Sequence, residues 1–237
     1  MTTKKIKHIR GTIGGAPIIF GESVQGLPLE VWLPEKKRDI HTLIMAGQHG
    51  DEAEGPILLS YALRLIDLAD LTCAVIVTAN PDGLRYGTRA NANGVDLNRN
   101  WSTKNWSPEM VIYPKDSEHP DDLTLSPGTE PASEPETQAL LNLLEDINPR
   151  LVISIHSALG CIDDPHITPT AKWLADQTRL PLVPNVGYPT RGSFGSWALE
   201  NDLELITWEL PRASLHEIKA KYAPALMELL TGSEKLR

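Results

Sequence analysis

The chain has 237 residues, with 22 lysines and arginines against 31 aspartates and glutamates, and a formal net charge of -9. Hydrophobic residues make up 41% and charged residues 22%, which is typical of an ordinary globular protein. The acidic balance argues against nucleic acid or an anionic membrane as a partner, because phosphate surfaces select for basic patches. Composition therefore excludes partner classes without naming a function.

The cysteines and the N-terminal residues bear on the compartment. Cys73 and Cys161 are too few for a disulfide-dependent secreted domain, so we expect two buried, reduced thiols, with a single bridge as the alternative. The basic residues 1–10 are not followed by the apolar run of a secretory signal. These features predict a cytoplasmic protein.

Short apolar runs alternate with segments of helical spacing. Residues 42–46 and 74–79 predict buried strands, and residues 57–66 between them predict a helix. Further strands are predicted at residues 151–155 and 203–210. Continuous apolar runs are typical of strands covered on both faces. We therefore expect an α/β fold with a mixed, mostly parallel sheet and helices on both faces.

Two capping boxes mark predicted helix starts. Ser133 in S-E-P-E is the predicted N-cap, with Glu136 three residues on, and that helix extends to Ile147. Ser214 and Glu217 repeat the pattern before a C-terminal helix.

Residues 81–131 differ from the rest, since they are rich in Asn, Gly, Pro, Asp and Trp and show little periodicity. A long irregular segment inside a domain is often functional. With no linker or repeat in view, we expect one domain over residues 1–237.

Potential metal ligands follow the predicted strands. His49 and Glu52 come just after the first strand, His156 directly follows the third, and Glu209 lies near the end of the fourth. In open α/β sheets, the carboxyl ends of the strands face the ligand-binding crevice. Two histidines and a glutamate are a zinc-ligand set, with the second glutamate left over as a base.

Each of these residues also has a plain structural reading. A helix N-terminus favours acidic residues such as Glu52, and a histidine or glutamate at a strand end can be an ordinary polar residue. Their convergence at one sheet edge favours the metal site.

The irregular segment supplies cations near this crevice. Arg89, Asn98 and Arg99 lie in G-T-R-A-N-A-N-G-V-D-L-N-R-N. Solvated arginines between Asn-Gly turns are the simple interpretation. Alternatively, guanidinium groups bind carboxylates and stabilise a developing oxyanion, which would suit an anionic substrate.

Taken in order, these blocks resemble a known family, the zinc carboxypeptidases of the carboxypeptidase A type. The matching blocks are H-x-x-E at 49–52, N-P-D-G at 80–83, G-V-D-L-N-R-N at 94–100, S-E-P-E at 133–136, the histidine after a strand at 156, and W-E-L around 209. The resemblance covers nearly the whole chain after about residue 40. It implies a single-domain zinc carboxypeptidase-like fold.

The resemblance also implies roles for individual residues. His49, Glu52 and His156 would hold one zinc ion per subunit, and Glu209 would act as the general base. Arg89 would stabilise the oxyanion. Asn98 and Arg99 would bind the carboxylate next to the scissile bond, and Tyr188 would close over the substrate.

Within the family, the blocks look most similar to bacterial members that cleave the γ-D-glutamyl–meso-diaminopimelate amide of recycled cell-wall peptides. The segment S-A-L-G-C-I-D-D-P departs from the digestive enzymes. There Asp163 and Asp164 are candidates to bind the distal ammonium of diaminopimelate, and Asp164 is our choice. An Asp-Asp-Pro turn is the alternative.

The implied function is a metallocarboxypeptidase acting on small muropeptides. A deacylase of N-acyl amino acids, of the aspartoacylase or desuccinylase type, shares the H-x-x-E and the distant histidine, but the G-V-D-L-N-R-N and S-E-P-E blocks favour the peptidase. An inactive peptide-binding module on the same fold is a third reading, which the presence of Glu209 and all three ligands opposes. Cobalt or manganese could also occupy a zinc site. A homodimer is a hypothesis for which the sequence gives no direct signal.

Overall fold

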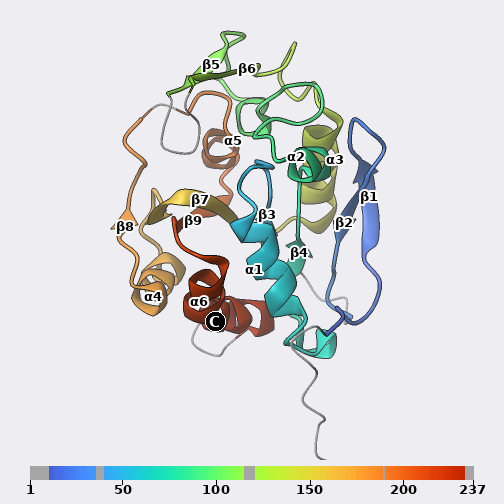
Figure 1. The fold of residues 1–237 in the computed structure, drawn as a ribbon, viewed down its shortest axis with the longest axis vertical. Helices are drawn as coiled ribbons and strands as arrows, with labels where there is room; N and C mark the ends of the chain where they lie inside the picture. Colours follow the sequence, from blue (N-terminus) through green and yellow to red (C-terminus); the bar gives the residue numbers. More distant parts are fainter. Residues whose placement is uncertain (1–10, 36–39, 115–120, 189, 233–237) are drawn as a thin grey trace, which may run out of the picture.

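A sheet of five described strands forms the centre of the molecule (Figure 1). The computed structural model describes residues 11–35, 40–114, 121–188 and 190–232, so the basic N-terminal residues lie outside it. The strands of the sheet are β3 (Thr42–Ala46), β4 (Ala74–Ile76), β7 (Leu151–Asp163), β8 (Leu182–Val183) and β9 (Glu204–Pro211).

The sheet is built around β7, which is longer than predicted. Its first half pairs in parallel with β3 and with β9, so that His156 lies opposite Glu209. After a register shift at Ala158 the partners on β9 run backward, and Asp163 lies opposite Thr207. The second half also pairs with β8. The predicted mostly parallel sheet is therefore confirmed, with a reversal that the apolar pattern did not indicate.

Helices cover both faces of the sheet, as predicted. One face packs against α1 (Glu54–Leu63), α4 (Pro169–Thr178) and α6 (Leu215–Thr231). The other packs against α3 (Pro135–Ile147) and α5 (Phe194–Glu200). The adjacent β3 residues Leu43 and Ile44 belong to opposite core clusters and are both fully buried, because a strand alternates its faces.

The predicted capping boxes have different outcomes. Ser214 and Glu217 form both reciprocal hydrogen bonds. Ser133 does not cap α3: Glu134 is the N-cap, Pro135 occupies the first turn, and the Ser133 hydroxyl donates to Glu134 Oε1 at 2.7 Å. Proline is favoured at the first helical position, which fixes the start one residue later than predicted.

The remaining elements frame the upper and outer parts of the fold. A hairpin of β1 (Ile18–Glu22) and β2 (Pro28–Val31) lies against α3. The segment predicted as irregular contains α2 (Pro81–Tyr86), a 3-10 turn (Leu97–Arg99), and a hairpin of β5 (Val111–Tyr113) and β6 (Leu123–Leu125). A second 3-10 turn, Leu68–Asp70, lies earlier in the chain.

Cys73 and Cys161 are both free and buried. None of the described helices has the length and apolarity needed to cross a membrane.

Candidate metal centre and substrate cavity

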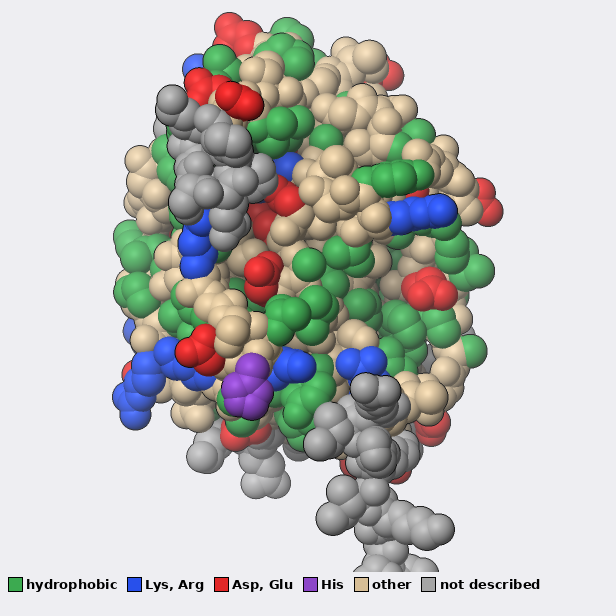
Figure 2. Space-filling model, in the orientation of Figure 1, with side chains coloured by type: hydrophobic (Ala, Val, Ile, Leu, Met, Phe, Trp, Pro, Cys, Tyr) green, Lys and Arg blue, Asp and Glu red, His purple; other side chains and the backbone are tan. Residues whose placement is uncertain are grey.

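A cavity of about 650 Å³ lies at the carboxyl ends of β3 and β9 and along the bend of β7. Acidic side chains gather in a hollow of the face drawn in Figure 2, with a basic side chain beside them. The cavity brings together eight of the nine predicted site residues, His49, Glu52, Arg89, Asn98, Arg99, His156, Tyr188 and Glu209.

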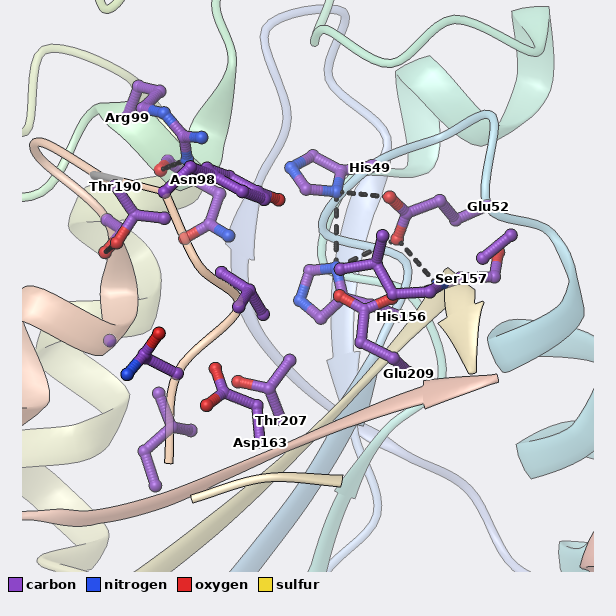
Figure 3. A pocket seen from close by; sticks show the side chains of 18 of the residues that line it. His49, Glu52, Asn98, Arg99, His156, Ser157, Asp163, Thr190, Thr207 and Glu209 are labelled. Carbon is purple, nitrogen blue, oxygen red and sulfur yellow. Dashed lines mark hydrogen bonds and ion pairs between the residues drawn. The ribbon is translucent and has the colours of Figure 1, made fainter. Parts of the chain in front are cut away.

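The three predicted metal ligands lie in direct contact (Figure 3). Glu52 is 2.8 Å from His49 through Oε1 and 2.8 Å from His156 through Oε2. The Nδ1 atoms of the two histidines are 3.2 Å apart. All three side chains are buried, and of the described residues only they form such a group.

This donor set fits a zinc ion. Ligand atoms about 2.05 Å from a tetrahedral zinc are roughly 3.3 Å from one another, close to the spacing of the two Nδ1 atoms. Two imidazoles and a carboxylate are also a common ligand set of catalytic zinc, which leaves a fourth position open.

The turn after β3 places His49 over the sheet edge. Gly47 has a φ of 65°, and a Cβ there would lie 2.7 Å from Thr78 Oγ1. Only glycine adopts this conformation in so little space, so the residue is needed for the path from β3 to the ligands.

Glu209 lies on β9 beside the ligand set. It is 9% exposed, and its Oε2 accepts a hydrogen bond from the Leu159 N–H at 3.4 Å. Burial is the main reason that the pKa of Glu209 is raised above its ordinary value. A buried carboxylate with a raised pKa is suited to take up and release a proton.

Two arginines and an asparagine form a polar part of the cavity wall. Arg89 donates from Nη1 to Glu52 Oε1 at 2.9 Å. Asn98 accepts the Phe194 N–H at 2.9 Å through Oδ1, which orients its amide. Arg99 is 6% exposed and donates to the Asn98 carbonyl at 2.6 Å. Figure 3 shows Asn98 and Arg99 across the cavity from Glu209.

A family model described as zinc carboxypeptidase matches residues 16–183. The chain belongs to the zinc carboxypeptidase family.

Two relatives match this zinc carboxypeptidase over most of its length. Murein peptide amidase A of Escherichia coli (strain K12) is 42% identical over 99% of this chain and 98% of its own. Murein peptide amidase A of Vibrio campbellii is 41% identical over 90% of this chain and 87% of its own.

Solved structures agree with the fold. Murein-tripeptide amidase from Escherichia coli O157 superimposes with a TM-score of 0.91 at 41% identity, covering 98% of each chain. Carboxypeptidase A from Helicoverpa armigera gives 0.70 at 18% identity, over 93% of this chain and 68% of that one, which shows a shared fold.

Sequence reasoning missed two residues behind the ligands of this zinc carboxypeptidase. Asp96 is fully buried, with Oδ1 3.1 Å from His49 Nε2, and the Tyr113 hydroxyl donates to its Oδ2. Although burial opposes ionisation, His49 and Arg89 hold the pKa of Asp96 well below its ordinary value. A carboxylate on the far nitrogen of a ligating histidine fixes the ring orientation.

Tyr113 and Tyr188 border the cavity from different segments. The Arg89 guanidinium lies 4.3 Å from the centre of the Tyr113 ring, an attractive cation–π contact. Tyr188 is half-exposed and lines the cavity between β8 and α5, and its partial burial is the main cause of its raised pKa. A signal for Tyr113 was absent, because its hairpin is short and irregular in sequence.

The predicted substrate contact at Asp164 needs correction. Asp164 is 1% exposed and does not line the cavity; its Oδ2 accepts from the N–H and hydroxyl of Thr168, both at 2.7 Å, and its Oδ1 accepts from the His166 N–H at 2.9 Å. This is the turn that the alternative reading described. The neighbouring Asp163 lines the cavity instead.

Proposed function

We propose that this protein is a zinc-dependent amidase that hydrolyses the γ-D-glutamyl–meso-diaminopimelate bond of the murein tripeptide. The correspondence with murein-tripeptide amidase of Escherichia coli O157, at 41% identity over 98% of both chains, carries the proposal. The cavity supports it independently, because ligand set, base and carboxylate-binding residues all face one space.

His49, Glu52 and His156 would hold the zinc ion. Zinc, when bound, supplies Lewis-acid chemistry that activates water and polarises the scissile carbonyl. Glu209 takes the proton from the attacking water and returns a proton to the leaving amine. Arg89 stabilises the negative charge that develops on the carbonyl oxygen.

Arg99 and Asn98 select the end of the peptide. A guanidinium binds a carboxylate through two parallel hydrogen bonds, which restricts cleavage to a residue with a free carboxylate beside the scissile bond. The Asn98 amide, held by the Phe194 N–H, orients the same carboxylate. The cut is therefore of the exopeptidase type.

The test is release of diaminopimelate from L-Ala-γ-D-Glu-meso-diaminopimelate. We expect cleavage by the metal-loaded protein, loss of cleavage after chelation, and recovery with added zinc. Parallel assays with succinyl- and acetyl-amino acids decide the deacylase alternative, which requires these to be the better substrates. Tight binding of the tripeptide without metal-dependent cleavage would instead identify a peptide-binding module.

The cytoplasmic location and the homodimer stay predictions. Light scattering on the purified protein measures its mass against the 26.1 kDa of one chain.

A further inference from the structure

Asp163 is a carboxylate in the cavity wall without a protein partner for one of its oxygens. It lies at the end of β7 and lines the cavity. Its Oδ1 is buried and forms no hydrogen bond with any described residue. Burying an oxygen of a charged group without a partner costs free energy, so a hydrogen-bond donor placed at this carboxylate would be stabilising.

The charge of Asp163 is uncompensated as well. Burial first, and then the nearby charge of Asp164, raise the pKa of Asp163 to about 6. Asp51, another cavity carboxylate with a buried unpartnered oxygen, differs because the Arg89 guanidinium counteracts the rise in its pKa. No cation is therefore among the described groups that shift the pKa of Asp163, in contrast to Asp51.

The sheet fixes where Asp163 lies relative to Glu209, the proposed base. Asp163 lies opposite Thr207, and Thr207 precedes Glu209 by two residues on β9. Residues two apart on a strand point to the same face and are separated by roughly 7 Å. Figure 3 shows Asp163 and Thr207 side by side on the side of β9 that carries Glu209.

The cavity wall beyond Thr207 is apolar. Leu203 and Leu205 of the β9 segment and Leu199 of α5 line the same cavity. A side chain of several methylene groups that starts near Glu209 would reach Asp163 beside Thr207, before it meets these leucines.

We propose that Asp163, with the Thr207 hydroxyl beside it, forms a subsite for an ammonium group at the far end of the leaving residue's side chain. The inference rests on the proposed function and deepens it, because it explains the choice of a diamino acid. The ammonium donates to the unpartnered carboxylate and neutralises its charge, which a plain aliphatic side chain cannot do.

The experiment compares substrates with and without that ammonium. The tripeptide ending in meso-diaminopimelate is assayed beside the same tripeptide ending in 2-aminopimelate, which lacks the distal amino group, and one ending in lysine, which retains it. The proteins are the zinc-loaded wild type, Asp163→Asn and Glu204→Gln. Glu204 is an exposed carboxylate of β9 that does not line the cavity, so its variant controls for loss of one charge.

We expect Asp163→Asn to lower kcat/KM for both ammonium substrates about tenfold or more. The kcat/KM of the 2-aminopimelate peptide should stay unchanged or rise, because its distal carboxylate no longer meets the charge of Asp163. Glu204→Gln should behave as wild type on all three. Unfolding temperature and zinc content, measured in parallel, establish that Asp163→Asn is folded and loaded.

Equal losses on all three substrates, or no loss on any, would overturn the subsite. If the wild type cleaves none of the peptides, the proposed function fails, and calorimetric binding of the same peptides still decides the role of Asp163. In that case the subsite requires weaker binding of the ammonium peptides to Asp163→Asn and unchanged or tighter binding of the 2-aminopimelate peptide.

Discussion

His156 and Glu209 lie directly opposite each other on the parallel strands β7 and β9. A proposed metal ligand and the proposed base are therefore held by the backbone hydrogen bonds of the sheet interior, and their separation does not depend on a loop. Because Glu209 is not a ligand in this arrangement, its chemistry can be removed without removing the metal.

Replacing Glu209 by glutamine tests this separation. The Glu209→Gln variant keeps the shape of the side chain but loses its proton acceptor, so kcat should fall about a hundredfold or more. Zinc content, measured by atomic absorption, should equal that of the wild type. Wild-type turnover of the tripeptide would show that another group acts as the base.

Asp96 should affect zinc affinity. It orients His49 through Nε2 at 3.1 Å, and loss of such a partner typically weakens metal binding about tenfold to a hundredfold. Competition of Asp96→Asn with a fluorescent chelator measures this loss. Excess zinc should restore part of the activity, whereas an effect on folding alone would not respond to zinc.

Arg99 should be sensitive to replacement by lysine, although the charge is kept. Lysine cannot form the paired hydrogen bonds of a guanidinium, so Arg99→Lys should lower kcat/KM for the tripeptide about tenfold or more. With a tripeptide whose terminal carboxylate is amidated, the variant and the wild type should differ little. A large difference there would indicate that Arg99 acts elsewhere in the reaction.

Asp163→Asn should stabilise the protein at neutral pH. The pKa of Asp163 is about 6 in the folded state against an ordinary 3.8. A raised pKa means that its contribution to stability is complete below about pH 3.8 and is lost as the pH rises through about 6.

The carboxylate is partly exposed, so we allow about 1 kcal/mol, which corresponds to roughly 2–4 °C in the unfolding temperature of a chain this long. Calorimetry on the metal-free proteins should show this gain at pH 7.5, and a smaller one at pH 5. A constant difference at both values would assign the effect to packing.

Replacing Asp164 should destabilise the protein, whereas replacing Asp163 should stabilise it. Its oxygens accept two hydrogen bonds from Thr168 and one from His166 in a buried turn. Asp164→Ala leaves these donors unpaired and should lower the free energy of unfolding by about 2 kcal/mol or more. The Asp164→Ala variant should prefer ammonium substrates over the 2-aminopimelate peptide as strongly as the wild type does, as measured by the ratio of kcat/KM values.

The main features of the site follow from strand ends in the sequence. His49, His156 and Glu209 could be predicted to converge because parallel strands share one carboxyl edge. The choice of Asp164 over Asp163 was wrong, because it depends on which face the second half of β7 presents. That face is set by the register reversal after Ala158, which apolar patterning does not encode.

Local signals also fail where a neighbour outweighs them. Ser133 has the spacing of an N-cap, but Pro135 starts the helix and the Ser133 hydroxyl bonds with Glu134 and Asn100. Asp96 lies inside the G-V-D-L-N-R-N block, but its contact with His49 is visible only in the fold. Tyr113 becomes recognisable only once the fold brings its hairpin over Arg89.

The bend of β7 places β9 between the two halves of that strand, so β9 forms the floor along which the leaving residue's side chain would lie. Cavity-facing positions on β9 occur at every second residue, so the floor offers binding points only in increments of roughly 7 Å. A carboxylate at Leu205 in place of one opposite Thr207 would match a leaving residue longer by one such increment. The position of a single charge along β9 would therefore determine which length of leaving residue the cavity prefers.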